Sequence, residues 1–209
     1  VHTTIRVNHY HSGEFKKFHN KFCQNDLQLK NNDITRFRNY MNYRFADYAI
    51  RNNKNGNFLS VGVSYGTVAK TITHLLDSKV KDIKYFLIDN YKDIGDKNYN
   101  LDINNVKKDL NDIKNFNFFF IEELLSQKSL NKVEKDLIFT HLATGNLQAE
   151  FELLPEIISK TKINGVIVMD SYGSNEQLID NFVSENENLF KIVLPSRQCV
   201  IINFSSWLL

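Results

Sequence analysis

The chain has 209 residues, a net charge of +2 at pH 7 and two cysteines. This length suits one domain with a sizeable buried core, and two cysteines in dissimilar contexts exclude both a disulfide framework and a cysteine-based zinc cluster. No apolar run approaches the roughly 18 residues of a membrane span, and residues 1–30 contain no signal-peptide core. The sequence therefore predicts a cytoplasmic protein with no membrane partner.

The basic charge is concentrated in residues 1–54, which hold ten lysines and arginines against four acids, and four of the six histidines. We expect this segment to be a helical extension or lid of the same domain, ahead of a nucleotide-binding part in residues 55–209. Its basic surface either faces an anionic substrate or partner or is an ordinary solvated helix surface, and the sequence leaves both open.

A helix is predicted from Asp33 onward, because Asp33 is a suitable N-cap and apolar side chains then recur at spacings of three and four. A helix just before the first strand of such a sheet often lies over the ligand cleft, although most of its aromatic side chains should be core contacts. The recurring side chains are Ile34, Phe37, Met41, Phe45 and Tyr48.

A glycine-bracketed turn follows the first predicted strand and opens a helix. Residues 58–61 form an apolar strand, Gly62 and Gly66 bracket the turn, and residues 67–76 have an amphipathic helical pattern. Glycine allows a sharp bend and the close approach of a ligand. This arrangement is typical of the first βα unit of a doubly wound sheet, whose ligands bind beyond the carboxyl ends of the strands. A tight turn without a ligand is the plainer alternative.

An acidic residue strengthens the nucleotide-site interpretation. Residues 83–88 form a second apolar strand, and Asp89 follows it, 23 residues after Gly66. A carboxylate at about this spacing accepts hydrogen bonds from ribose hydroxyls, because the second strand lies beside the first and ends level with it. The turn and the acid together predict a nucleoside-containing cofactor.

Three further strands are predicted at residues 116–121, 136–141 and 166–170. Their nearly continuous apolar character indicates burial on both faces, as in a parallel sheet between helices. Five equivalent strand ends then bring one set of side chains to the same edge of the sheet and predict a site there. The set comprises Gly62, Asp89, Glu122, His141 and Asp170.

Residues 147–160 have a helical pattern that we expect Pro155 to kink or interrupt, and Asn164-Gly165 is expected to open the fifth strand. The last two strands are predicted at residues 189–194 and 198–203. The short link between them requires an antiparallel hairpin. The predicted fold class is α/β, with a doubly wound, mostly parallel seven-stranded sheet, helices on both faces and a C-terminal antiparallel hairpin.

The order and spacing of four motifs resemble the class I S-adenosylmethionine-dependent methyltransferases, in particular their macrocin O-methyltransferase-like branch. The resemblance covers roughly residues 34–203 and implies a Rossmann-like methyltransferase fold with S-adenosylmethionine as cofactor. The motifs are Leu59-Ser60-Val61-Gly62-Val63-Ser64-Tyr65-Gly66-Thr67, Leu87-Ile88-Asp89, Asn164-Gly165-Val166-Ile167-Val168-Met169-Asp170-Ser171-Tyr172 and Arg197-Gln198-Cys199-Val200-Ile201-Ile202.

The resemblance also implies roles for individual residues. Asp89 would hold the ribose and Glu122 would lie near the adenine. Tyr91 would either stack on the adenine or be an ordinary core or surface aromatic. The glycine turn would lie under the methionine part of the cofactor, and its residues are Gly62, Val63, Ser64, Tyr65 and Gly66.

The chain departs from the family pattern at the expected acids. Thr140-His141-Leu142-Ala143-Thr144 replaces an acidic run after the fourth strand, and Ser171 stands where a second acid is usual before Tyr172. A hard divalent ion such as Mg²⁺ needs several oxygen ligands, so we expect no metal. Ser60 also replaces a common acid, which weakens contact to the amino end of the cofactor.

The resulting prediction is an O-methyltransferase acting on a hydroxyl of a small molecule such as a sugar or glycoside. His141 is the candidate base because an imidazole titrates near neutral pH, and Asp170 is the second candidate. A structural, catalytically silent histidine is an equal alternative.

The sequence also leaves two other functions to consider. The missing acids favour, as an alternative, a catalytically weakened methyltransferase-like protein that serves as a binding or assembly subunit. A nicotinamide-dependent oxidoreductase agrees with the glycine turn and Asp89 but not with the final hairpin. No nucleic-acid partner is expected from the modest basic excess, and the sequence leaves a homo-oligomer open.

Overall fold

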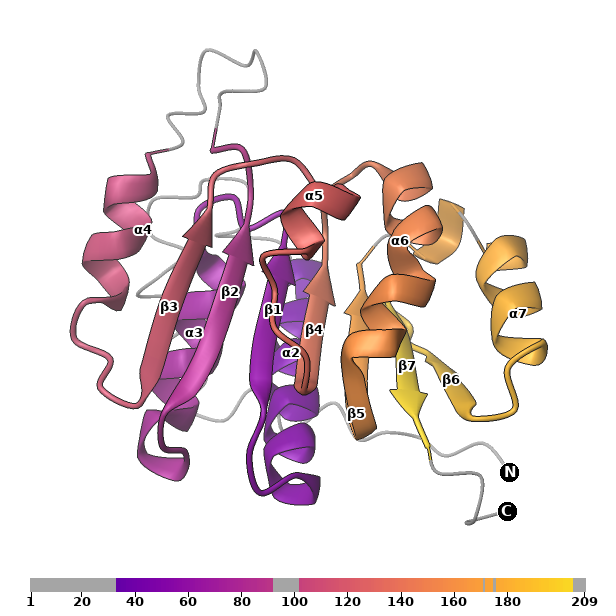
Figure 1. Ribbon diagram of the computed structural model, residues 1–209, viewed down its shortest axis with the longest axis horizontal. Coiled ribbons are helices and arrows are strands. Elements are labelled where there is room, and N and C mark those ends of the chain that lie inside the picture. The colour runs from indigo at the N-terminus through magenta and orange to yellow at the C-terminus, as the bar shows by residue number, and fades with distance from the viewer. Residues whose placement is uncertain (1–32, 92–101, 171, 175, 205–209) are drawn as a thin grey trace.

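The computed structural model describes residues 33–91, 102–170, 172–174 and 176–204 (Figure 1). Most of the expected N-terminal extension, the position of Ser171 and the last five residues lie outside this part of the chain. The predicted helix within the extension is present as α2, Asp33–Asn52.

A seven-stranded sheet forms the centre of the molecule, with strand order β3-β2-β1-β4-β5-β7-β6. The first five strands pair in parallel, while β7 pairs antiparallel with both β5 and β6. This confirms the predicted α/β sheet with its C-terminal hairpin. The strands are β1 Asn57–Val61, β2 Ile83–Ile88, β3 Phe116–Ile121, β4 Leu137–Leu142, β5 Thr161–Met169, β6 Leu189–Val193 and β7 Cys199–Asn203.

Helices cover both faces of the sheet and bury two separate apolar cores. One core is shared with α2, α3 (Thr67–Leu76) and α4 (Ile103–Leu110), and the other with α5 (Gln127–Leu130), α6 (Leu147–Lys160) and α7 (Glu176–Ser184). Two 3₁₀ turns, Asp77–Lys79 and Tyr172–Ser174, complete the helical elements. Within the described residues, no helix is both long and apolar enough to cross a membrane.

Alternation along the strands divides the side chains between the two cores. Phe58 and Tyr85 belong to the core under α2–α4, whereas Leu59 and Phe86 belong to the core under α5–α7. Successive side chains of a strand point to opposite faces, so a strand that is buried on both faces must be apolar throughout. The apolar runs in the sequence have this physical cause.

One predicted strand boundary and one predicted helix interruption are wrong. β5 begins at Thr161 and not at Val166, with Asn164 inside it at φ 62°, because extra residues of β5 are accommodated by a register shift against β4. Proline does not interrupt α6, which runs continuously through Pro155. A proline removes one intrahelical hydrogen bond, and the burial of Leu154 and Ile157 on either side offsets that loss.

The close approach of Gly62 to the chain after β4 generates a stability prediction. Gly62 and Gly145 have similar left-handed backbones, at φ 76° and 71°. An added Cβ would lie 2.3 Å from the Ala143 carbonyl oxygen at Gly62 but would meet nothing within 4 Å at Gly145. Gly145→Ala should cost about 1–2 kcal/mol of unfolding free energy. Gly62→Ala should cost about 1–3 kcal/mol more, as overpacking does.

Urea denaturation of both variants provides the measurement, with Gly145→Ala as the matched control for backbone strain alone. Equal losses in the two proteins would contradict the steric argument.

Candidate functional site

Four residues that directly follow parallel strands continue the hydrogen bonding of the sheet by one step. Their positions are therefore level along one edge, as the sequence predicted for Gly62, Asp89 and Asp170. The bonds run from the backbone N–H groups of Asp89, Gly62, Ala143 and Asp170 to the carbonyls of Ile121, Ile88, Val61 and Leu142, at 3.2, 2.9, 2.9 and 2.9 Å.

The Asp89 carboxylate joins two neighbouring loops at this edge. Its Oδ2 accepts a hydrogen bond from the Ser64 backbone N–H at 2.7 Å, and its Oδ1 accepts one from the Tyr91 N–H at 2.9 Å. Both donors have left-handed backbones, at φ 50° and 48°. Such conformations are costly without glycine and persist where surrounding contacts hold them. Asp89 thus fixes the shape of the glycine turn.

Two cavities flank this edge and meet at Gly62, Ser64 and Ala143, which line both. The α2-side cavity, of about 270 Å³, also borders α2, α3 and the ends of β4 and β5. The α6-side cavity, of about 390 Å³, also borders the ends of β2 and β3 and the loop into α6. Their meeting point lies between β1 and β4, where the strand order reverses and open α/β sheets bind ligands.

His141 and Asp170 face each other in the α2-side cavity. His141 Nε2 lies 3.3 Å from Asp170 Oδ2, within ion-pair range but without the alignment of a good hydrogen bond. The ring is only 3% exposed. It belongs to the penultimate residue of β4, whereas the sequence predicted it at the last residue of that strand, because β4 continues to pair through Leu142. It therefore lies on the sheet face.

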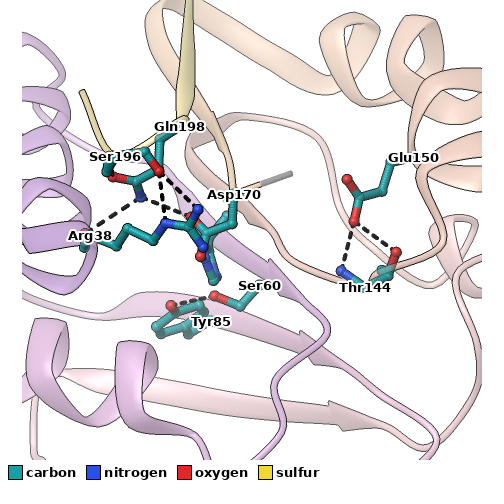
Figure 2. A network of polar contacts seen from close by, with 9 residues as sticks. Arg38, Ser60, Tyr85, Thr144, Glu150, Asp170, Ser196 and Gln198 are labelled. Carbon is teal, nitrogen blue, oxygen red and sulfur yellow. Dashed lines mark hydrogen bonds and ion pairs between the residues drawn. The ribbon is translucent and has the colours of Figure 1, made fainter. Parts of the chain in front are cut away.

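Asp170 is held as an anion by its surroundings. Burial opposes its ionisation, but the opposing His141, a hydrogen bond from Gln198 and the charge of Arg38 together keep the pKa of Asp170 below its usual value. Gln198 Nε2 donates to Asp170 Oδ1 at 2.8 Å (Figure 2). Sequence reasoning missed Gln198 and Arg38, and the only signal was the Arg197-Gln198-Cys199 motif itself.

The α6-side cavity has two carboxylates among its described residues, Asp89 and Glu123. Glu123 Oε1 is paired with Lys128 and Lys132 at 3.0 Å each, while its Oε2 is buried and has no hydrogen-bond partner among the described residues. The hydrogen bonds from these lysines lower the pKa of Glu123. The adjacent Glu122, which the resemblance favoured, is exposed, lies 3.5 Å from Lys107 and does not line this cavity.

Tyr91 also lies away from both cavities. Its side chain is buried in the core under α2–α4, with its ring centroid 6.5 Å from that of Phe120. Burial, followed by the nearby charges of Asp89 and Glu122, raises the pKa of Tyr91. Tyr91 was expected either to stack on the adenine or to be an ordinary core or surface aromatic, and its position agrees with a core aromatic.

Buried hydrogen bonds shape two further parts of the site (Figure 2). Glu150, fully buried on α6, accepts bonds from the Thr144 backbone N–H at 2.6 Å and from its hydroxyl at 2.7 Å, which fixes the loop lining the α6-side cavity. Ser60 shares a hydrogen bond of 2.7 Å with the Tyr85 hydroxyl. Burial raises the pKa of Tyr85, so this pair places neutral hydroxyls where the family pattern has an acid.

The described residues contain no group of three or more histidine, cysteine or acidic side chains arranged to hold a metal ion. In the α2-side cavity Asp170 is the one carboxylate among the described lining residues. Its Oδ1 accepts the Gln198 bond and its Oδ2 faces His141. These donors are a poor set for a hard divalent cation, which prefers six or more oxygen ligands.

Comparison with solved structures identifies the fold. The O-methyltransferase NovP aligns with 13% identity over 80% of each chain, at a TM-score of 0.63. The apo structure of CalS11, a TDP-rhamnose 3'-O-methyltransferase of calicheamicin biosynthesis, aligns with 10% identity over 97% of this chain and 96% of its own, at 0.61. The SAH-bound Podospora anserina methyltransferase PaMTH1 aligns with 12% identity over 92% and 88%, at 0.61.

No protein-family model and no curated protein matches the sequence. At such low identity the structural likeness is one of fold. The chain therefore has the Rossmann-like fold of the class I S-adenosylmethionine-dependent methyltransferases, as its motifs predicted.

The lowered pKa of Asp170 generates a prediction about stability and pH. A carboxyl group whose folded pKa lies below its unfolded value, about 3.9, stabilises the fold above that value, and this contribution is lost as the pH falls through the folded pKa. Asp170→Asn should therefore lower the unfolding free energy at neutral pH, and its deficit should shrink below about pH 4. Urea titrations of both proteins across this range measure the difference. A deficit independent of pH would contradict the assignment.

Proposed function

We propose that this protein is an S-adenosylmethionine-dependent O-methyltransferase that methylates a hydroxyl of a small molecule. One observation carries the proposal: the cavity holding Asp89 joins, at Gly62, the cavity holding the His141–Asp170 pair. A cofactor bound along this edge would span both. The O-methyltransferase neighbours CalS11 and NovP support the same reading.

The residues present fit the cofactor. Asp89 has lone pairs left for ribose hydroxyls, because each of its oxygens accepts only one backbone bond. We assign Glu123 to the adenine side, since its buried Oε2 lacks a partner and a carboxylate can accept a bond from an amino group. Thr67, whose buried hydroxyl is also without a partner, offers a polar contact beside the glycine turn. When bound, S-adenosylmethionine supplies a methyl group on a sulfonium sulfur.

His141 is the proposed base. Asp170, kept ionised, favours the tautomer with its proton on Nε2, as in other aspartate–histidine pairs. Nδ1 then carries the lone pair that removes the acceptor proton. No described residue makes a hydrogen bond to Nδ1, so it remains available to an acceptor in the α2-side cavity.

The acceptor side of the cavity is polar and uncharged. Thr35 and Asn39 extend it on α2, and the buried Asn39 Nδ2 has no hydrogen-bond partner within residues 33–91, 102–170, 172–174 and 176–204. A buried donor without a partner costs about 1–3 kcal/mol, which a ligand oxygen would recover. These side chains suit a neutral hydroxylated acceptor such as a sugar, and CalS11 is a methyltransferase of a sugar nucleotide.

The runner-up is a methyltransferase-like binding or assembly subunit that retains the cofactor. The family acids that this sequence lacks favour it, and both functions predict cofactor binding. The two functions differ in turnover, which only the enzyme shows. Release of S-adenosylhomocysteine in a screen of simple hydroxylated compounds is therefore the test of the proposed function, and binding without any release would support the runner-up.

Asp89→Ala should weaken S-adenosylhomocysteine binding by at least about tenfold, because charge-assisted hydrogen bonds are worth roughly 1.5–3 kcal/mol each. Isothermal titration calorimetry measures the affinity, and circular dichroism checks the fold. Glu134→Ala is a matched control, since Glu134 is an exposed acid paired with Lys84 before β4, at the other end of the strand. Equal affinity in all three proteins would exclude Asp89 from the cofactor site.

His141→Ala should lower turnover by about 10²–10⁴-fold while leaving affinity for S-adenosylhomocysteine unchanged. The loss follows because the substitution removes the imidazole that would take up the acceptor proton. The measurement is initial rate per folded molecule at several pH values, with an acceptor from the screen.

His74→Ala is the control, because His74 lies on α3 near the backbone of Asp109 and outside both cavities. Since we propose no metal requirement, the rate should also be the same after chelation. An unchanged rate and pH profile in His141→Ala would mean that the histidine is structural.

A further inference from the structure

Gln198 stands immediately before β7 and is fully buried, with both ends of its amide bonded. Its Oε1 accepts a hydrogen bond from the Ser196 hydroxyl at 2.8 Å, and its Nε2 donates to Asp170 Oδ1 at 2.8 Å (Figure 2). The amide must present its N–H groups to the Asp170 carboxylate, and its oxygen is then left to accept from the hydroxyl. This orientation suits an ionised carboxylate, which only accepts hydrogen bonds.

The turn that carries Gln198 is tied to α2. The Arg38 guanidinium donates two bonds to the Ser196 carbonyl, at 3.1 Å from Nε and 2.8 Å from NH2. Gln198 Nε2 also lies 3.5 Å from the Arg38 carbonyl oxygen. Backbone bonds between Leu194 and Gln198 and between Arg197 and Leu194, both 2.9 Å, close the turn itself. Gln198 is thus held both by bonds to α2 and by the backbone bonds of its own turn.

We propose that Gln198 is a positioning residue that sets the orientation of Asp170 and, through it, the tautomer of His141. With Oδ1 held by the amide, Oδ2 is directed at His141 Nε2, 3.3 Å away. The carboxylate then stabilises a proton on Nε2 and leaves Nδ1 as the proton acceptor. The value of this arrangement for catalysis rests on the proposed function, whereas the geometry and its effect on the tautomer do not.

Loss of the amide would release the carboxylate. A buried charge that loses its hydrogen bond reorients or takes up water, because an unsatisfied buried acceptor is costly. Asp170 has no second side-chain donor among the described residues apart from the facing imidazole. Within the part of the chain that the structure describes, this is the one polar contact at the imidazole Nε2, so its tautomer should respond directly.

The test uses the full chain labelled with ¹⁵N-histidine, at a pH where the imidazole is neutral. His141→Ala identifies the His141 signals. Wild type should show a protonated Nε2 and a bare Nδ1, and Gln198→Met, which keeps the side-chain length but removes both bonds, should show a mixture of tautomers. Asn203→Leu is the matched control, because it removes hydrogen bonds from the far end of β7 and should retain the wild-type tautomer.

Ser196→Ala is the second variant, and it keeps the proposal testable if Gln198→Met does not fold. It removes the hydroxyl that orients the amide and should give a smaller shift in the same direction. A wild-type tautomer in the folded Gln198 and Ser196 variants would overturn the proposal, as would a mixture of tautomers in wild type.

Turnover separates this proposal from the proposed function. If both hold, Gln198→Met should lose at least about tenfold in rate at unchanged S-adenosylhomocysteine affinity, a smaller loss than the roughly 10²–10⁴-fold expected when a general base is removed. A tautomer change in a protein that binds the cofactor but transfers no methyl group would support the positioning role and reject the enzyme. Turnover with an unchanged tautomer in Gln198→Met would support the enzyme and reject the positioning role.

Discussion

The site depends on the close approach of two chain segments at one point of the sheet edge. β1 and β4 are neighbours, and the chain leaving β4 passes Gly62 so closely that a Cβ there would lie 2.3 Å from the Ala143 carbonyl oxygen. From this point the chain turns to α3 on one face and to α6 on the other. The two cavities open on either side of the contact and share Gly62, Ser64 and Ala143. A bulkier residue would push these segments apart and change both cavities.

The polar side chains around this contact need hydrogen-bond partners because they lie in or beside a buried sheet. A sheet buried on both faces has little room for polar side chains, and those it contains need partners. Asp89, Asp170 and Glu150 meet this requirement by accepting hydrogen bonds from neighbouring loops, and in doing so they hold those loops in place. The buried atoms that have no partner include Asn39 Nδ2 and Thr67 Oγ1, both from residues lining the α2-side cavity. A ligand that forms a hydrogen bond with such an atom would remove the free-energy cost of leaving it buried and unpaired.

The fold alone does not select an acceptor, so the function depends on these local groups. The neighbours at 10–13% identity share the fold with this chain. The local groups at this edge are the carboxylate of Asp170 facing His141, the amide of Gln198 behind it and the hydroxyl pair of Ser60 and Tyr85.

The sequence by itself determined the sheet, the glycine turn and the positions of Asp89 and Asp170, because strand periodicity and strand order act locally and place strand ends at a common edge. It also determined β2 and β3 to the residue, since both are apolar runs with one polar residue each, Lys84 in β2 and Asn117 in β3. Only the tertiary structure decided which acid after β3 faces the cavity, that Tyr91 is in the core, and that Arg38 and Gln198 meet Asp170. Residues 38 and 198 are 160 positions apart, and no periodicity relates them. Their contact follows from the packing of α2 against the sheet and from the reversal of the chain between β6 and β7, which bring distant residues together only after the core has formed.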